Sequence, residues 1–139
     1  MMRYKLKENN LLPLVAKFGR KIDNCVVILK GDLAAGKTTL VKAVAKAMGV
    51  EDEVTSPTFS LQQVYGEKLF HYDIYNHGLE HFISLGMLEE LEKEGIHFIE
   101  WGDDTLRDIL VEAGMSVVVI EIEKIADDER EYKVDYAHA

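Results

Sequence analysis

The sequence predicts one α/β domain over residues 1–139, in which helices cover both faces of a mainly parallel sheet. Three observations carry this prediction. The length of 139 residues suits a single hydrophobic core. Apolar runs typical of buried strands alternate with helical patterns after residue 26. Two short apolar runs around Gly66 indicate an antiparallel hairpin attached to the parallel strands.

The first half of the chain supplies two helices and up to four strands. Residues 3–7 are expected to form a short strand. Apolar residues at helical spacing predict a helix over 11–18, with Pro13 in its first turn. The run 26–29 predicts a buried strand, and 38–48 predicts a helix that Gly49 ends. The hairpin strands are expected at 60–65 and 68–72.

The second half continues the alternation. A helix is expected over 79–93, ended by Gly95, and then a strand over 96–101. Asp103 or Asp104 can cap the next helix, 105–113, which Gly114 closes. The β-branched run 116–122 predicts a strand, and the alternation over 130–136 predicts a last strand with one wet face.

The composition narrows the class of protein. Hydrophobic residues make up 47% and charged residues 29%, which is typical of a soluble globular chain. No apolar run approaches the roughly 20 residues of a membrane span, and the N-terminus lacks the apolar region of a secretion signal. Cys25 is the single cysteine, so it is expected to be a buried structural thiol. These features favour a cytoplasmic protein with no membrane partner.

The net charge of −9 disfavours strong binding of tRNA or DNA by this chain alone. Proteins that grip nucleic acid usually present a basic surface, whereas the few arginines here are mostly scattered along the chain.

One stretch has the pattern G-x-x-x-x-G-K-T between the predicted strand 26–29 and the helix 38–48. Its residues are Gly31, Asp32, Leu33, Ala34, Ala35, Gly36, Lys37 and Thr38. This pattern is the phosphate-binding loop of nucleoside-triphosphate proteins, in the strand–loop–helix context that it requires. The predicted domain is therefore P-loop NTPase-like.

The chemistry of this loop follows from its backbone. Gly31 and Gly36 let the chain fold tightly around an anion, so that backbone N–H groups and the helix N-terminus point at phosphate. Lys37 would place its ammonium on the β- and γ-phosphates, and Thr38 would offer its hydroxyl to Mg²⁺. The expected ligands are ATP or ADP with Mg²⁺.

A second ligand for Mg²⁺ should be a carboxylate at the end of another strand. Three acids compete: Asp73, Glu100 and Glu121. Glu121 lies inside a continuing alternation, which favours the wet face of a strand. Periodicity does not choose between Asp73 and Glu100. Ligands in such sheets lie at the carboxyl ends of the strands, where the phosphate loop and both acids are expected.

Two further residues are site candidates with ordinary alternatives. His71 and Asp73 are two apart and share one face of a strand, so they could pair on a metal or form a His–Asp hydrogen bond lining the site. Trp101 could cover the nucleotide or pack in the core.

Four motifs in one order resemble the TsaE (YjeE) family, the small bacterial P-loop ATPases required for the threonylcarbamoyladenosine modification of tRNA. They are the phosphate loop with Thr39, then Ser56-Pro57-Thr58-Phe59, then His71-Tyr72-Asp73-Ile74-Tyr75, and then Ile99-Glu100-Trp101. The resemblance spans nearly the whole chain. The phosphate loop alone is generic, whereas the set of four is specific.

The resemblance implies roles that the residues leave open. It assigns Glu100 to Mg²⁺ together with Thr38, and it makes Ser56–Phe59 a switch-like loop near the γ-phosphate. It implies that Asp73 is important for hydrolysis and that Arg130 lies near the nucleotide base. It also implies the partners TsaD and TsaB, with tRNA reached only through their complex. ATP hydrolysis would drive the cycling of that complex and would be weak in the isolated chain.

Three positions depart from the family pattern. Ala34 stands where a Gly is usual, which is tolerable at negative φ. Asn76 stands where an Arg usually follows the Tyr75 position. Gly102-Asp103 replaces the usual Pro-Glu after the Trp, which loosens the turn but leaves Glu100 in place.

Other functions fit the sequence less well. A small-molecule P-loop kinase usually brings lid arginines to the phosphates, and only Arg107 and Arg130 follow the loop. A guanine-nucleotide switch needs an Asn-Lys-x-Asp motif, which this sequence lacks. A structural subunit with a vestigial site is disfavoured because Lys37 and Thr38 are intact.

Overall fold

The computed structural model describes residues 2–7, 10–11, 13–15, 24–31, 37–49, 62–66, 69–74 and 78–137. Residues 32–36 of the phosphate loop, the predicted Ser56–Phe59 loop and Asn76 lie outside these ranges. Most of the helix predicted over 11–18 also lies outside them, although residues 13–15 are helical.

The described strands form one sheet in the order β1-β7-β6-β2-β5-β4-β3. Its four central strands, β6, β2, β5 and β4, run parallel, and β3, β7 and β1 join the edges antiparallel. The bounds are β1 Met2–Lys7, β2 Asn24–Lys30, β3 Gln62–Tyr65, β4 Leu69–Asp73, β5 Gly95–Glu100, β6 Val117–Lys124 and β7 Glu129–Ala137. The mainly parallel α/β sheet is confirmed, and antiparallel strands lie at both of its edges.

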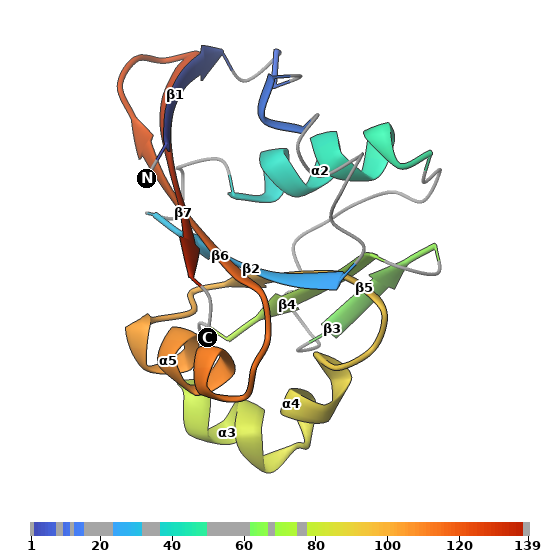
Figure 1. Ribbon diagram of the computed structural model, residues 1–139. Helices are drawn as coiled ribbons and strands as arrows, with labels where there is room; N and C mark the ends of the chain where they lie inside the picture. The colour runs from blue at the N-terminus through green and yellow to red at the C-terminus, as the bar shows by residue number, and fades with distance from the viewer. Residues whose placement is uncertain are drawn as a thin grey trace.

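Helices cover both faces of the central strands, as predicted (Figure 1). Helix α2 (Lys37–Ala47) lies on one face, and α3 (Gly78–Ser84), α4 (Met87–Glu90) and α5 (Asp104–Glu112) lie on the other. The apolar run of β2 is buried throughout because side chains from both faces of this strand meet a helical layer.

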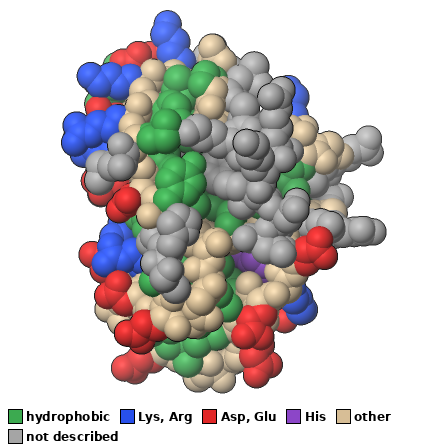
Figure 2. Space-filling view, in the orientation of Figure 1, with side chains coloured by type: hydrophobic (Ala, Val, Ile, Leu, Met, Phe, Trp, Pro, Cys, Tyr) green, Lys and Arg blue, Asp and Glu red, His purple; other side chains and the backbone are tan. Residues whose placement is uncertain are grey.

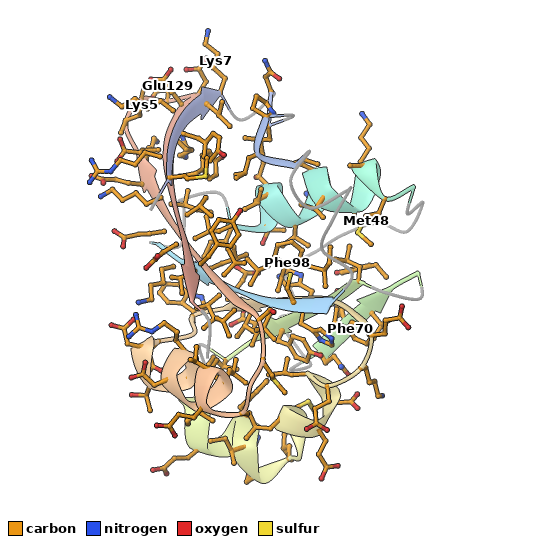
Figure 3. All side chains as sticks on the ribbon, viewed as in Figure 1. Lys5, Lys7, Met48, Phe70, Phe98 and Glu129 are labelled. Carbon is orange, nitrogen blue, oxygen red and sulfur yellow. The ribbon has the colours of Figure 1, made fainter. Side chains whose placement is uncertain are left out.

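The sheet separates two hydrophobic cores. Phe98 belongs to the core beneath α2, and Phe70 belongs to the core shared with α3 and α5, so these two side chains point to opposite faces (Figure 3). Cys25 is buried in the α2 core, and burial raises the pKa of its thiol to about 12. The predicted structural thiol is thereby confirmed as a buried one.

The caps of two helices are confirmed. Gly49 follows α2 at φ 78, a left-handed conformation that glycine adopts without strain. Asp103 is the N-cap of α5, and its side chain accepts a 2.9 Å hydrogen bond from the backbone N–H of Leu106.

The single helix predicted over 79–93 is wrong. Gly86 adopts φ 76 and ends one helix, so the segment divides into α3 and the short α4. The regular i→i−4 ladder breaks there because the Gly86 N–H bonds to the carbonyl of Ile83, three residues back. Gly95 does not end a helix but begins β5.

Charge is unevenly spread on the surface. Lys and Arg side chains gather at the upper left of one face, over the β1–β7 edge, and Asp and Glu prevail along its lower margin (Figure 2). Among the described helices, none is long and apolar enough to cross a membrane.

Candidate functional site

The carboxyl ends of three parallel strands meet at one point of the sheet. Glu100 at the end of β5 lies in register with Leu29 of β2 and with Asp73 of β4. The backbone N–H of Ile74 also donates to the Glu100 carbonyl at 3.3 Å. The start of the phosphate loop and both candidate acids therefore share this edge, as the sequence predicts.

Lys37 is the first residue of α2, and only 3% of it is exposed. Its Nζ donates a 2.8 Å hydrogen bond to the carbonyl of Gly31, the first residue of the loop motif. The same Nζ lies 3.4 Å from the centroid of the Trp101 ring. Gly31 has φ 147, a conformation that L side chains rarely adopt, so glycine is required at this turn.

Glu100 is only 4% exposed, and one of its carboxylate oxygens forms hydrogen bonds with two side chains. The Thr38 hydroxyl donates to Oε2 at 3.4 Å, and His71 Nε2 bonds to the same oxygen. Oε2 of Glu100 is therefore shared by a hydroxyl group and an imidazole nitrogen. His71 comes from β4, Glu100 from β5 and Thr38 from α2, so three separate elements converge here.

This donor set fits Mg²⁺. Both Thr38 and Glu100 present oxygen, the ligand that Mg²⁺ prefers. Adjacent ligands of an octahedral Mg²⁺ at about 2.1 Å lie about 3 Å apart. The 3.4 Å between Thr38 Oγ1 and Glu100 Oε2 is close to that spacing.

Glu121 lies away from this group. It is exposed on β6, opposite Lys30 and Lys133 in register, on the wet face that the alternation predicts. Asp73 is half-buried beside Glu100. The hydrogen bond to Thr38 thus places Glu100, rather than Glu121, next to the end of the phosphate loop.

His71 is completely buried, and its Nε2 contacts Glu100. The sequence offered a pairing with Asp73 instead, because the two share one strand face. The other ring nitrogen, Nδ1, has no hydrogen-bond partner among the described residues.

A family model described as "Threonylcarbamoyl adenosine biosynthesis protein TsaE" matches residues 7–132. The chain belongs to the TsaE family. It is 39% identical over 115 residues to a tRNA threonylcarbamoyladenosine biosynthesis protein TsaE of Treponema pallidum, covering 81% of this chain and 82% of that protein. It is 35% identical over 121 residues to the TsaE of Bacillus subtilis, covering 85% and 72%.

A solved structure supports the fold. The crystal structure of Bacillus subtilis YdiB matches with a TM-score of 0.67 and 25% identity, over 99% of this chain and 86% of that chain. The resemblance to the TsaE family is thereby confirmed, together with the predicted fold.

The turn that follows β5 is tightly packed. A Cβ at the buried Gly102 would lie 2.8 Å from Cγ2 of Ile28. Gly102 therefore fits where a larger residue would require Ile28 to move. Gly102 is enclosed and Asp103 caps α5, whereas the expectation that Gly102-Asp103 loosens the turn relative to Pro-Glu stays a prediction.

Sequence reasoning missed one ion pair at the base of the loop. Lys30, the last residue of β2, bonds to Asp104 in the first turn of α5 at 2.5 Å. This bond is the main reason that the pKa of Asp104 lies below its usual value. The sequence signal for this ion pair was the position of Lys30 directly before Gly31, since a partner that fixes Lys30 also fixes the start of the loop.

Arg130 lies at the carboxyl edge, on β7, two strands away from β2. It is buried, and its Nη1 donates to the carbonyls of Ala126, Asp127 and Glu129 at 2.9, 3.3 and 3.1 Å. These bonds hold the turn between β6 and β7. Its expected contact with a nucleotide base remains a prediction.

Proposed function

We propose that this chain binds and hydrolyses Mg-ATP and that this turnover serves the threonylcarbamoyladenosine modification of tRNA. The observation that carries the proposal is the convergence of Lys37, Thr38 and Glu100 at the ends of β2 and β5. Membership of the TsaE family supplies the biological context.

Phosphate would be held by the backbone of Gly31, Asp32, Leu33, Ala34, Ala35 and Gly36, by the Lys37 ammonium, and by Thr38 and Thr39 in the first turn of α2. The helix N-terminus adds partial positive charge at the same point. ADP would occupy the same cradle after hydrolysis.

Thr38 and Glu100 would hold Mg²⁺, whose charge offsets that of the β- and γ-phosphate oxygens. His71 keeps the Glu100 carboxylate turned toward Thr38, because Nε2 bonds to the same oxygen that receives the Thr38 hydroxyl. Asp73 lies beside Glu100 in register and would order either the attacking water or the ligands around Mg²⁺. Ser56–Phe59 would be a switch-like loop near the γ-phosphate.

The turnover is proposed to be weak in the isolated chain. Arg107 bonds to Asp108 and also pairs with Asp104, and Arg130 holds the β6–β7 turn. Neither guanidinium is directed by these contacts to the phosphate loop. An arginine supplied by a partner raises turnover by about 10³-fold or more in other nucleotide hydrolases.

The proposed partners are TsaB and TsaD, with ATP hydrolysis driving the cycling of their complex. The chain's net charge of −9 suits contact with tRNA through that complex rather than directly. The proposal includes a cytoplasmic location, where the complex would meet tRNA.

Two measurements test the proposal. ATP hydrolysis by the purified chain is compared with and without TsaB and TsaD, and the partners should raise it by about tenfold or more. Depletion of the protein in cells should lower threonylcarbamoyladenosine in tRNA. Unchanged modification would refute the biological part, and an equal rate without partners would refute the partner dependence.

A further inference from the structure

The ammonium of Lys37 is buried against two groups in the described part of the chain. Its Nζ lies 2.8 Å from the Gly31 carbonyl oxygen and 3.4 Å from the centroid of the Trp101 ring. A buried ammonium is costly unless it is compensated, and a carbonyl oxygen and the face of an indole both present negative potential. These two contacts therefore fix the position of the Lys37 side chain.

The backbone holds Trp101 in an unusual conformation. Trp101 has φ 69 and is the single non-glycine residue with positive φ in the described part of the chain. A bulky residue in this region is strained and persists only where its surroundings determine it. Here the Trp101 N–H donates to the Leu29 carbonyl at 3.3 Å, and the next residue, Gly102, is packed against Ile28.

We propose that Trp101 positions Lys37 in the nucleotide-free site and that phosphate binding releases it. On release, the ammonium leaves the indole ring and the Gly31 carbonyl and donates to phosphate oxygens. The proposal rests on the proposed ATP site and adds a regulatory contact to it. Trp101 is thus a positioning residue, because it acts on phosphate through Lys37.

The exchange is favourable because of the charges involved. A phosphate oxygen carries a full negative charge, so its hydrogen bond with an ammonium is stronger than one from a neutral carbonyl. The contact with the ring is lost in the exchange, and its loss opposes nucleotide binding. Cation–π contacts are worth about 0.5 to 2 kcal/mol, which corresponds to roughly 2- to 30-fold in nucleotide affinity.

The single tryptophan of the sequence makes the contact directly observable. Its emission is recorded in the free protein and during titration with Mg-ADP, while equilibrium dialysis measures nucleotide binding independently. The emission spectrum should change as nucleotide binds. In Lys37→Met, the free protein should already differ from the wild type. Lys42→Met, an exposed lysine on the same helix, should match the wild type.

Two substitutions of the ring test the effect on affinity. Trp101→Leu removes the aromatic face and should bind Mg-ADP more tightly, by roughly 2- to 30-fold. Trp101→Phe retains a ring and should lie closer to the wild type. Thermal unfolding of both variants verifies that they are folded.

The outcomes separate this proposal from the proposed function. If dialysis shows binding but the emission spectrum of Trp101 changes neither with nucleotide nor in Lys37→Met, the positioning role is overturned and the nucleotide site stands. Equal or weaker affinity in Trp101→Leu than in Trp101→Phe would also overturn it. If dialysis detects no nucleotide, the proposed function fails together with the release step.

Discussion

Strands β5 and β6 flank the same strand, β2, and each carries a glutamate after an apolar run. Glu100 on β5 is buried and bonded by Thr38 and His71, whereas Glu121 on β6 is exposed. Both glutamates lie beside β2 in register, opposite Leu29 and Lys30. The register beside β2 therefore does not distinguish the two glutamates.

The neighbours of the two strands explain this difference. All six residues of β5 are buried, because it lies between β2 and β4 and under helices on both faces. β6 continues to Lys124, beyond Glu121, and pairs with the antiparallel β7. Its last residues alternate between buried and exposed, so Glu121 faces water. Because β5 ends in the buried centre of the sheet, its last residue, Glu100, lies at the candidate site.

Substitution of the two glutamates should show the largest difference between the two strands. Glu100→Gln should lower ATP turnover in the presence of the partners by about 100-fold or more, because it removes the charged oxygen proposed to hold Mg²⁺ together with Thr38. Glu121→Gln should leave turnover within about twofold, since surface substitutions rarely matter. Steady-state hydrolysis of the two variants decides it. Equal losses in both would show that the site does not depend on Glu100.

The second effect concerns two glycines beside these strands. Gly102→Ala, after β5, should destabilise the fold by about 1–3 kcal/mol because its Cβ meets Ile28. Gly114, before β6, has φ 82, and a Cβ added there would have no neighbouring atom within 4 Å. Gly114→Ala therefore carries only the backbone strain of about 1 kcal/mol. Urea unfolding measures both.

A double variant tests the cause of the loss at Gly102. Ile28→Ala removes the side-chain atom that the new methyl group would meet. Combining it with Gly102→Ala should destabilise the fold by less than the sum of the single changes. Full additivity would show that the packing against Ile28 is not the cause.

The third effect arises from a hydrogen-bond network around a buried polar residue of β5. The buried residues of β6 are all apolar. His97 Nδ1 accepts from the Tyr72 hydroxyl at 2.8 Å, and Nε2 donates to the Lys93 carbonyl at 2.8 Å. Burial lowers the pKa of His97, opposed by the bond to Lys93. In the neutral ring, both nitrogens of His97 form a hydrogen bond. Protonation of Nδ1 would remove its ability to accept and would break the bond from Tyr72.

The sign of the pH dependence follows from this lowered pKa. The unfolded chain protonates His97 near pH 6.5 while the folded chain does so only at lower pH. The free energy of unfolding should therefore fall as pH decreases below about 6.5, with a slope of at most one proton from this residue. Urea unfolding at several pH values should show a smaller slope in His97→Gln. An unchanged slope would contradict the assignment.

The weakest effect lies on the wet face of β6. Lys133 pairs with Glu123 at 3.8 Å, and both side chains reach solvent. Glu123→Ala should change the free energy of unfolding by less than about 0.5 kcal/mol, since exposed ion pairs contribute little. Thermal unfolding at low and high salt checks this prediction. A larger loss of unfolding free energy would mean that this ion pair is less accessible to water than an exposed pair.

Most local elements and the set of competing acids could be predicted from the amino-acid sequence. Apolar runs marked β2, β5 and β6 because burial on both faces requires continuous apolar side chains. The motif ending in Lys37-Thr38 predicts a candidate phosphate site because the chemistry of such a loop depends on residues adjacent in the chain. The four-motif resemblance indicated the family, which the family model confirms.

Which of these residues meet depends on the tertiary structure. Glu100 and His71 are 29 residues apart, and the register of β4 and β5 brings them together. The contact of Lys37 with Trp101 likewise joins two separate elements. Periodicity describes the environment along one element, whereas strand order and register are set by pairing between distant segments. For that reason Asp73 and Glu100 looked equivalent in the sequence, and only the fold placed Thr38 against Glu100.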